Sequence, residues 1–199
     1  MSAKRSPTGA GARRAGSDGE EQIVTAAREL AENEGWDAVT TLRPAAEIEY
    51  GQPVLSSHFE GKDAVMAAVA VRGFAELAQE LRAARAAVAD PGDALAAVGE
   101  ACTDFGERRP ALYDAMFTHM HILDLRFATP EAPPALREAF GEPREVILPL
   151  AGDDDPGILA ETFWGGLRGL VTLMRSGRLP RAGHDRRLSL LIGHFAPPR

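Results

Sequence analysis

The side chains with metal-binding chemistry are few, and their spacing does not suit a shared ion. His119 and His121 are separated by one residue, and Cys102 is the only cysteine. On a helix, two histidines at this spacing point about 200° apart, so they cannot bind one ion together. The acidic run 153–155 precedes Pro156, where the preference of helix N-termini for negative charge is a simpler explanation than a divalent cation. We therefore expect no metal and no cofactor.

The recurring patterns of catalysis and nucleotide binding are also missing. The sequence contains no GxGxxG, P-loop, HExxH, GxSxG or CxxC pattern. It offers no nucleophile with an evident neighbouring base. We expect that the protein is not an enzyme.

Polar side chains between residues 51 and 62 have the spacing of a unit that reads a DNA groove. Glycine is an acceptable N-cap and proline is favoured in a first turn, so residues 51–53 (Gly-Gln-Pro) predict a helix start. A helix entering the major groove presents hydrogen-bonding side chains near its N-terminus. Gln52 could read adenine there, and Ser57 could contact a base or a phosphate. Lys62, after Gly61, places a cation and free amides where a phosphate could bind.

The elements that must position these groups are predicted to be helices throughout. Ser17 and Glu20 form a capping box, and apolar residues then recur at helical spacing until Gly35. A long helical pattern runs from Gly61 to about Val88, where Asp-Pro-Gly ends it. Further helices are expected at 92–106, 110–126, 133–149, 156–176 and 184–195. With no strand pattern present, the sequence predicts an all-α fold of about nine helices.

Composition limits the partners and the compartment. The chain has 199 residues, a net charge of −7 and one cysteine, so an intrachain disulfide is impossible. No apolar run approaches the roughly 18 residues that span a bilayer, and no secretory signal is evident, so we expect a cytoplasmic protein with no membrane role. The negative charge argues against a broad nucleic-acid coat, so any DNA contact must be local.

The residues from 23 to about 69 resemble the DNA-binding domain of the TetR family of transcriptional regulators. The resemblance rests on Ile23-Val24-Thr25-Ala26-Ala27, Glu34-Gly35-Trp36, Thr40, Ala45-Ala46-Glu47, Gln52-Pro53, Leu55, His58-Phe59 and Lys62-Asp63. It implies a three-helix head with a helix-turn-helix, joined by a long helix to a ligand-binding, dimer-forming helical bundle. The expected division is a disordered basic arm (1–16), a helix-turn-helix domain (17–63) and a ligand-binding and dimerisation domain (64–199).

Three positions depart from the family pattern in this head. Glu49 replaces a turn glycine, and Ser56 replaces a tyrosine that commonly binds phosphate. Pro44 replaces an aliphatic residue, and is compatible with a helix that starts at Thr41, because the amide at that position is unbonded in any case. The residues expected to contact DNA are Thr40, Arg43, Gln52, Pro53, Ser56, Ser57, His58 and Lys62.

The head carries little positive charge for a phosphate-facing surface. Residues 17–63 contain three basic side chains against eleven acidic ones, and basic side chains provide the counterion release that favours DNA binding. The arm adds Lys4, Arg5, Arg13 and Arg14. We hypothesise that these four residues supply much of the attraction to DNA.

The segment 161–174, ETFWGGLRGLVTLM, looks like the C-terminal domain of a TetR subfamily marked by Trp, His and Gly on this helix, with Arg168 in place of the His. A mostly apolar effector cavity would use Phe105, Tyr113, Met116, Phe117, Met120, Trp164 and Arg168, although ordinary core packing is the more common role for any single apolar member. Glycines on this helix allow a second helix to approach closely. The expected dimer interface is Phe163, Gly166, Leu170, Leu188, Leu191, Ile192 and Phe195.

Together these patterns predict a DNA-binding transcriptional regulator. The resemblance implies a ligand-responsive repressor whose two-fold dimer reads a palindromic operator in double-stranded DNA, with half-sites about 34 Å apart. The alternative is a small-molecule binding protein whose degenerate head does not read DNA.

Overall fold

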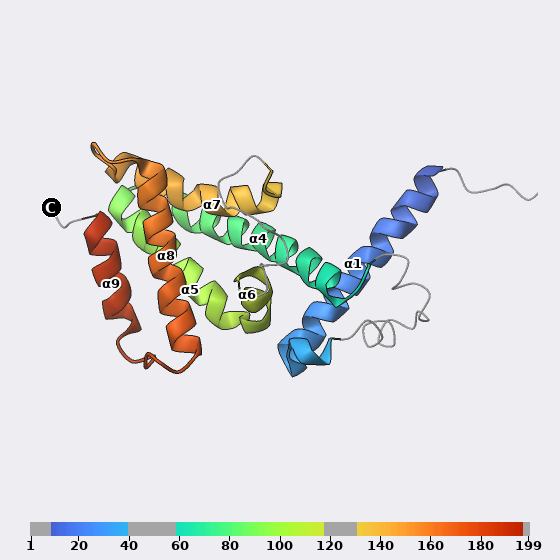
Figure 1. Cartoon of the computed structure of the whole chain (residues 1–199). Helices are drawn as coiled ribbons and strands as arrows, with labels where there is room; N and C mark the ends of the chain where they lie inside the picture. Colours follow the sequence, from blue (N-terminus) through green and yellow to red (C-terminus); the bar gives the residue numbers. More distant parts are fainter. Residues whose placement is uncertain (1–8, 40–58, 118–130, 197–199) are drawn as a thin grey trace, which may run out of the picture.

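The computed structural model describes residues 9–39, 59–117 and 131–196, with side chains from residue 19 onward. Seven α-helices and two short 3-10 helices make up the regular structure of these ranges (Figure 1). The predicted all-α fold is confirmed. Within the same ranges, no helix combines the length and apolar character needed to cross a membrane.

The first helix begins earlier than the sequence predicts. Helix α1 spans Gly9–Glu34 and is followed by the 3-10 helix η1, Trp36–Ala38. The predicted start at Ser17 is wrong, and residues 9–16, which we expected in a disordered arm, belong to the helix. Alanine and arginine are strong helix formers, and extending an existing helix costs less than starting one. The predicted end is confirmed, because Gly35 follows the helix with φ 85°.

The remaining helices have boundaries close to the predicted ones, except that the helix predicted at 110–126 is described only as far as Phe117. The long helix α4 spans Lys62–Ala86, α5 spans Pro91–Arg108 and α6 spans Pro110–Phe117. After these come α7 (Pro134–Ile147), η3 (Leu148–Leu150), α8 (Pro156–Arg175) and α9 (His184–Phe195). Asp90 and Asp155 cap α5 and α8 by accepting hydrogen bonds from backbone amides of the first turn.

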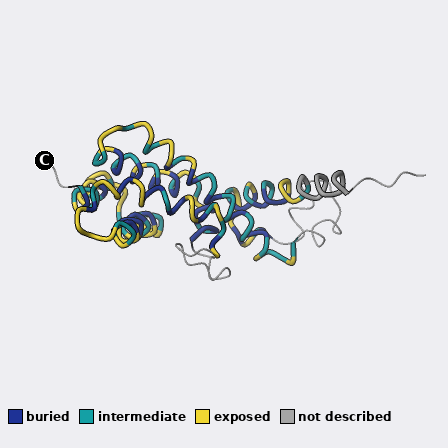
Figure 2. Tube along the Cα trace, turned by 90° about the horizontal axis from the view of Figure 1, so that it is seen from above, coloured by how far each residue is buried: buried dark blue, intermediate teal, exposed yellow. Residues whose placement is uncertain are grey.

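Helix α4 runs through the centre of the body and connects it to the head. It packs against α5, α6 and α7, and its other end contacts α1. Helices α8 and α9 lie beside each other and cover α5 (Figure 1), and buried residues occur in both the body and the head (Figure 2). The buried Glu142 on α7 accepts hydrogen bonds from Arg82 (2.9 Å) and Arg85 (2.8 Å), which fixes α7 to the far end of α4. One core therefore extends from the head to the outer helices.

Candidate functional site

Most of the predicted DNA contacts lie outside the described residues. These are Thr40, Arg43, Gln52, Pro53, Ser56, Ser57 and His58. Lys62 is described, as the first residue of α4 directly after Gly61. Its Nζ lies 3.8 Å from Oδ1 of Asp37 in η1. The first helical hydrogen bond is donated by the Val65 amide to the Gly61 carbonyl, so the amides of 62–64 have no intrahelical acceptor. Free amides at a helix start can bind a phosphate oxygen, and the DNA contact of Lys62 stays a prediction.

The predicted effector residues meet around the ring of Phe117, at the end of α6. The ring centroid of Phe117 is 4.6 Å from that of Tyr113, 5.3 Å from that of Phe74 and 6.0 Å from that of Trp164. Arg168 of α8 places its Cζ atom 4.6 Å from the same centroid and donates a hydrogen bond to the Phe117 carbonyl at 3.2 Å. Four of the seven predicted residues thus form one cluster, to which α4 contributes Phe74.

The other three predicted residues do not share this position. Phe105 and Met116 are completely buried. Phe105 lies beneath the Arg109 guanidinium, 4.7 Å from its Cζ atom. Met116 packs against Gly73 of α4, where a Cβ atom would come within 2.7 Å of its sulfur. Met120 lies outside the described residues. In this structure Phe105 and Met116 are core residues.

The cluster contains buried polar atoms with few hydrogen-bond partners. Tyr113 and Trp164 are each 3% exposed. Trp164 Nε1 has no partner among the described residues, and the Tyr113 hydroxyl has only the neighbouring Arg168 guanidinium. Burial raises the pKa of Tyr113 well above its usual value, with Arg168 and Arg175 offsetting this only in part. Buried polar groups in folded proteins are almost always satisfied. Buried donors beside the Phe117 ring are therefore candidates for hydrogen bonds to a ligand.

The first turn of α6 is held by the head. Both oxygens of Glu32 in α1 accept backbone hydrogen bonds, from the Ala111 amide (3.1 Å) and the Leu112 amide (3.0 Å). The Trp36 indole donates to the Ala111 carbonyl at 2.7 Å. Sequence reasoning missed this link, because Pro110 predicts a helix start but nothing local indicates which distant carboxylate caps it. One short helix therefore touches the head at one end and the Phe117 cluster at the other.

Arginines on both sides of α4 reinforce the contact between head and body. Arg28 of α1 donates to Glu76 at 2.6 Å, and Arg109, at the start of α6, donates to Glu80 at 2.6 Å. Burial raises the pKa of Glu80, but hydrogen bonds from Arg109 and Arg108 outweigh it, so that the pKa falls below its ordinary value. The carboxylate of Glu80 thus stays ionised, and it ties the start of α6 to α4.

Removing the Glu32 cap should weaken the docking of the head measurably. Glu32→Ala is expected to lower the free energy of unfolding by about 1–2 kcal/mol, because two backbone amides of α6 lose their acceptor. Urea denaturation followed by circular dichroism measures this change. Glu29→Ala is the matched control on an exposed position of α1 and should shift stability by no more than about 0.5 kcal/mol. Equal effects of the two substitutions would contradict the capping role.

The predicted dimer residues divide into an inner and an intermediate set. Phe163, Leu188 and Phe195 are buried within one chain, and the Phe163 and Phe195 rings meet at 5.3 Å. Gly166 faces α9, where a Cβ atom would come within 2.8 Å of Leu191. We predicted that all seven residues contact a partner subunit. The structure shows instead that Phe163, Leu188 and Phe195 are buried within their own chain. The apolar stripe of α8 is covered by α5 and α9 of its own chain. Leu170, Leu191 and Ile192 remain half-buried.

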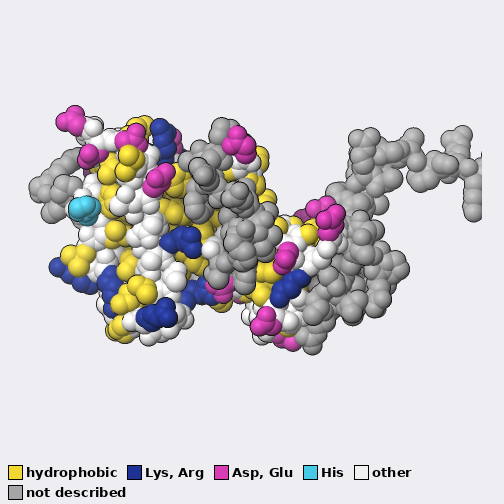
Figure 3. Space-filling view, viewed as in Figure 1, with side chains coloured by type: hydrophobic (Ala, Val, Ile, Leu, Met, Phe, Trp, Pro, Cys, Tyr) yellow, Lys and Arg dark blue, Asp and Glu magenta, His cyan; other side chains and the backbone are white. Residues whose placement is uncertain are grey.

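The outward face of α8 is the side opposite this stripe. Ile158 is 64% exposed there, and Leu173 is exposed on the same face. Between them a Cβ atom added at Gly165 or Gly169 would meet nothing within 4 Å. Leu190 of α9 is 58% exposed. In the view of Figure 3, uncharged and hydrophobic atoms form much of the surface over α8 and α9.

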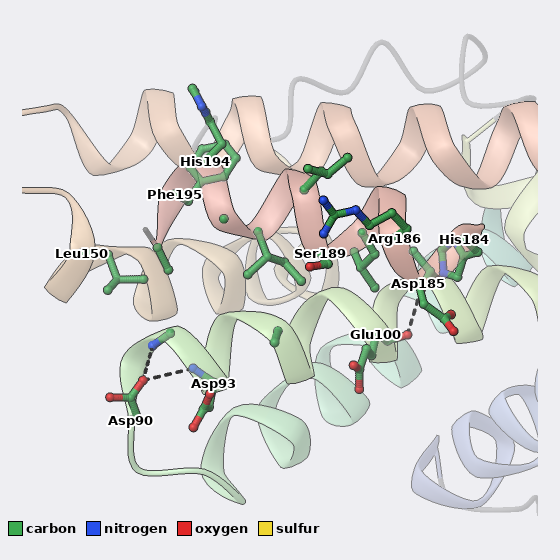
Figure 4. A pocket seen from close by; sticks show the side chains of 18 of the residues that line it. Asp90, Asp93, Glu100, Leu150, His184, Asp185, Arg186, Ser189, His194 and Phe195 are labelled. Atoms are coloured by element: carbon green, nitrogen blue, oxygen red, sulfur yellow. Dashed lines mark hydrogen bonds between the residues drawn. The ribbon is translucent and has the colours of Figure 1, made fainter. Parts of the chain in front are cut away.

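A groove of about 1300 Å³ lies between α5 and α9, away from the Phe117 cluster. Figure 4 shows that charged side chains enter it from both helices, including Asp93 and Glu100 on α5 and Asp185 and Arg186 on α9. It differs in this from the mostly apolar cavities that hold small ligands. It contains none of the residues predicted for the effector cavity, although Leu188, Ile192 and Phe195 of the predicted dimer set line it.

Two family models match the chain. The model described as "Tetracyclin repressor-like, C-terminal domain" matches residues 95–194, and the model "Bacterial regulatory proteins, tetR family" matches residues 23–69. A curated relative, "Uncharacterized HTH-type transcriptional regulator YobS" of Bacillus subtilis (strain 168), is 30% identical over 103 residues. This match covers 51% of the chain and 53% of the relative, so it spans about half the length of that protein.

Solved structures show the same fold at low sequence identity. The TetR family transcriptional regulator PfmR from Thermus thermophilus has a TM-score of 0.62 at 17% identity, over 89% of this chain and 100% of that one. RolR, solved in complex with resorcinol, has a TM-score of 0.68 at 14% identity, over 92% of this chain and 89% of that one. The family models match both the head and the body, and the described helices have the corresponding arrangement. The chain therefore belongs to the TetR family of DNA-binding transcriptional regulators, which are not enzymes.

Proposed function

We propose that this regulator is a cytoplasmic repressor, which binds a palindromic operator as a homodimer and releases it when a small molecule enters the Phe117 cluster. The observation that carries the proposal is the position of α6. Its first turn is capped by Glu32 and bonded by Trp36 of the head, while Phe117 lies further along the same helix. A change at the cluster thus reaches the head through one helix.

The contacts of α6 limit how it can move. Its middle packs against α4 at Gly73, where Leu112 and Met116 approach so closely that a Cβ atom would come within 2.7 Å of either. A displacement of Phe117 that shifts α6 must therefore also shift α4 or the docked head. The effector can bias the two arrangements only by its difference in affinity for them. RolR, with its bound resorcinol, supports the idea that this fold accommodates small effectors.

The homodimer is proposed to form through the outward face of α8, with Leu190 of α9. The exposed Ile158 and Leu173 lie on either side of two open glycines on this face, and small residues on a helix face let a second helix approach closely. A two-fold axis through α8 would make the face self-complementary. Two heads related by this axis could then bind the two halves of a palindrome.

Operator binding is tested by selecting genomic fragments that the purified full-length protein retains, and by measuring the affinity at several salt concentrations. Enrichment of a palindrome is the expected result. Replacing Lys4, Arg5, Arg13 and Arg14 with alanine should reduce the salt slope by about 0.9 for each phosphate that the protein no longer neutralises. Alanine at the exposed Arg178 and Arg186, on the part of the body far from the head, is the charge control (Figure 1).

One observation favours the alternative, which is a small-molecule binding protein whose head does not read DNA. Acidic residues outnumber basic ones in the described part of the head, and Lys62 lies beside Asp37. If the selection enriches no palindrome and the affinity equals that for random duplex, the repressor proposal is wrong. Ligand binding without operator binding would then support the alternative.

A further inference from the structure

Three hydrogen-bond donors surround the Phe117 ring, and no acidic group of the described ranges is paired with them. They are the Tyr113 hydroxyl, Trp164 Nε1 and the Arg168 guanidinium, which come from α6 and α8. Trp164 Nε1 has no partner among the described residues. The Tyr113 hydroxyl has only the neighbouring Arg168 guanidinium, which favours its ionised form and so lowers the pKa of Tyr113, against the larger rise that burial causes. The guanidinium donates to the Phe117 carbonyl, which is a neutral acceptor.

Arg168 differs in this respect from three other half-buried arginines of the body, although Arg187 of α9 also bonds only carbonyl oxygens. Arg85 bonds Glu142 at 2.8 Å, Arg109 bonds Glu80 at 2.6 Å, and Arg175 holds both oxygens of Asp114, at 2.9 and 2.7 Å. Within the described part of the chain, no carboxylate lies within salt-bridge distance of Arg168. A partly desolvated guanidinium gains most from an anionic partner in bidentate geometry.

We propose that the effector is a small carboxylate with a compact apolar body, which takes the place of the Phe117 ring and pairs its carboxylate with Arg168. This inference rests on the proposed function only in naming the ligand as the effector. A carboxylate offers about four acceptor sites, enough for the guanidinium, the tyrosine hydroxyl and the indole together. The apolar body would lie against Phe74, Phe140 and Trp164, because the Phe140 ring lies 6.1 Å from Trp164.

The position of Phe117 allows a ligand to displace its ring. Phe117 is 8% exposed, whereas Met116, before it in α6, is completely buried. Its ring is stacked by a cation and by aromatic edges that would serve a ligand ring equally well. A ligand ring of the size of the phenylalanine ring can therefore restore the packing that the displaced side chain gives up. The site is a minor conformation that the ligand stabilises.

The test is calorimetric titration of the full-length protein with benzoate and with benzamide, its neutral counterpart, in the absence of DNA. Benzoate should bind at least about tenfold more tightly than benzamide, since one charge-assisted hydrogen bond is worth about that factor. Arg168→Met should remove this preference, whereas Arg178→Met, on an exposed arginine after α8, should not. Acetate separates a general anion effect from binding of the apolar body, and should bind far more weakly than benzoate.

Two further variants separate a ligand-binding role from a structural one. Arg168→His should bind benzoate at pH 6 and lose affinity by pH 8, because imidazole gives up its charge near pH 6.5, whereas the arginine protein should bind equally at both values. Phe117→Leu should bind benzoate more tightly than the parent protein, because less packing must be displaced.

The outcomes also distinguish this inference from the proposed function. Equal binding of benzoate and benzamide, an unchanged preference in Arg168→Met, or no binding of benzoate up to about 10 mM would overturn the carboxylate assignment. Because the titration contains no DNA, each of these results leaves the operator selection to decide the repressor proposal. Failure of that selection, together with benzoate binding through Arg168, would leave the ligand class standing without a repressor.

Discussion

Replacing Phe163 with alanine is expected to lower the free energy of unfolding by about 3–5 kcal/mol. The side chain is completely buried between α5, α8 and α9 of one chain. Its ring meets Phe195 edge to face and approaches Gly99 so closely that a Cβ atom there would be 3.4 Å from it. The substitution leaves a cavity that the three helices fill only by moving. Urea denaturation at a fixed protein concentration measures the change.

A matched control comes from an apolar residue on the surface. Leu148→Ala alters a side chain that is 50% exposed in η3, and it should change stability by no more than about 0.5 kcal/mol. If Phe163→Ala instead gave a stable but monomeric protein, the side chain would belong to an interface between subunits. The burial of Phe163 within a single chain would then be wrong for the assembled protein.

Placing leucine at both Gly165 and Gly169 should convert the proposed dimer into monomers. Neither position has a neighbour within 4 Å of an added Cβ atom, so one chain accommodates both side chains. Each glycine removed from a helix interior should stabilise that chain by up to about 1 kcal/mol. A two-fold interface contains every substitution twice, so overpacking should weaken dimerisation by about 100-fold or more. Sedimentation equilibrium at several protein concentrations measures the dissociation constant.

The control is another open glycine in a helix that does not carry the proposed interface. Gly141 lies in α7 and also has no atom within 4 Å of an added Cβ. Gly141→Leu should leave the dimer intact. If the double variant remains dimeric while its stability rises, the subunits meet elsewhere. A parent protein that stays monomeric at all concentrations would remove the dimer from the proposed function.

The sequence predicted helix boundaries well wherever a local signal marks them. Asp90 caps α5, proline opens α8, and glycine in a left-handed conformation follows α1. The start of α1 was predicted too late, because the capping box at Ser17 was taken as the helix start. The residues before it give a mixed signal, since alanine and arginine favour a helix and the three glycines of 9–16 disfavour it.

The functional surfaces were only partly predictable, because they depend on which helix covers which face. The apolar stripe of α8 was recognised, but periodicity gives no information on whether a partner subunit or the same chain covers it. Phe163 therefore appeared as an interface residue although α9 covers it. The Phe117 cluster was named in outline from residue types. Its buried donors and the absence of a carboxylate near Arg168 within the described ranges emerge only from the three-dimensional contacts.

The Glu32 cap has a consequence for how the protein folds. The first turn of α6 takes its acceptor from a residue 79 positions earlier in the chain, and short helices gain most of their stability from such tertiary contacts. The start of α6 gains this acceptor only when the head is docked, and the head gains these contacts only when α6 is formed. Head and body therefore form one cooperative folding unit, and cutting the chain between them would leave α6 without its cap.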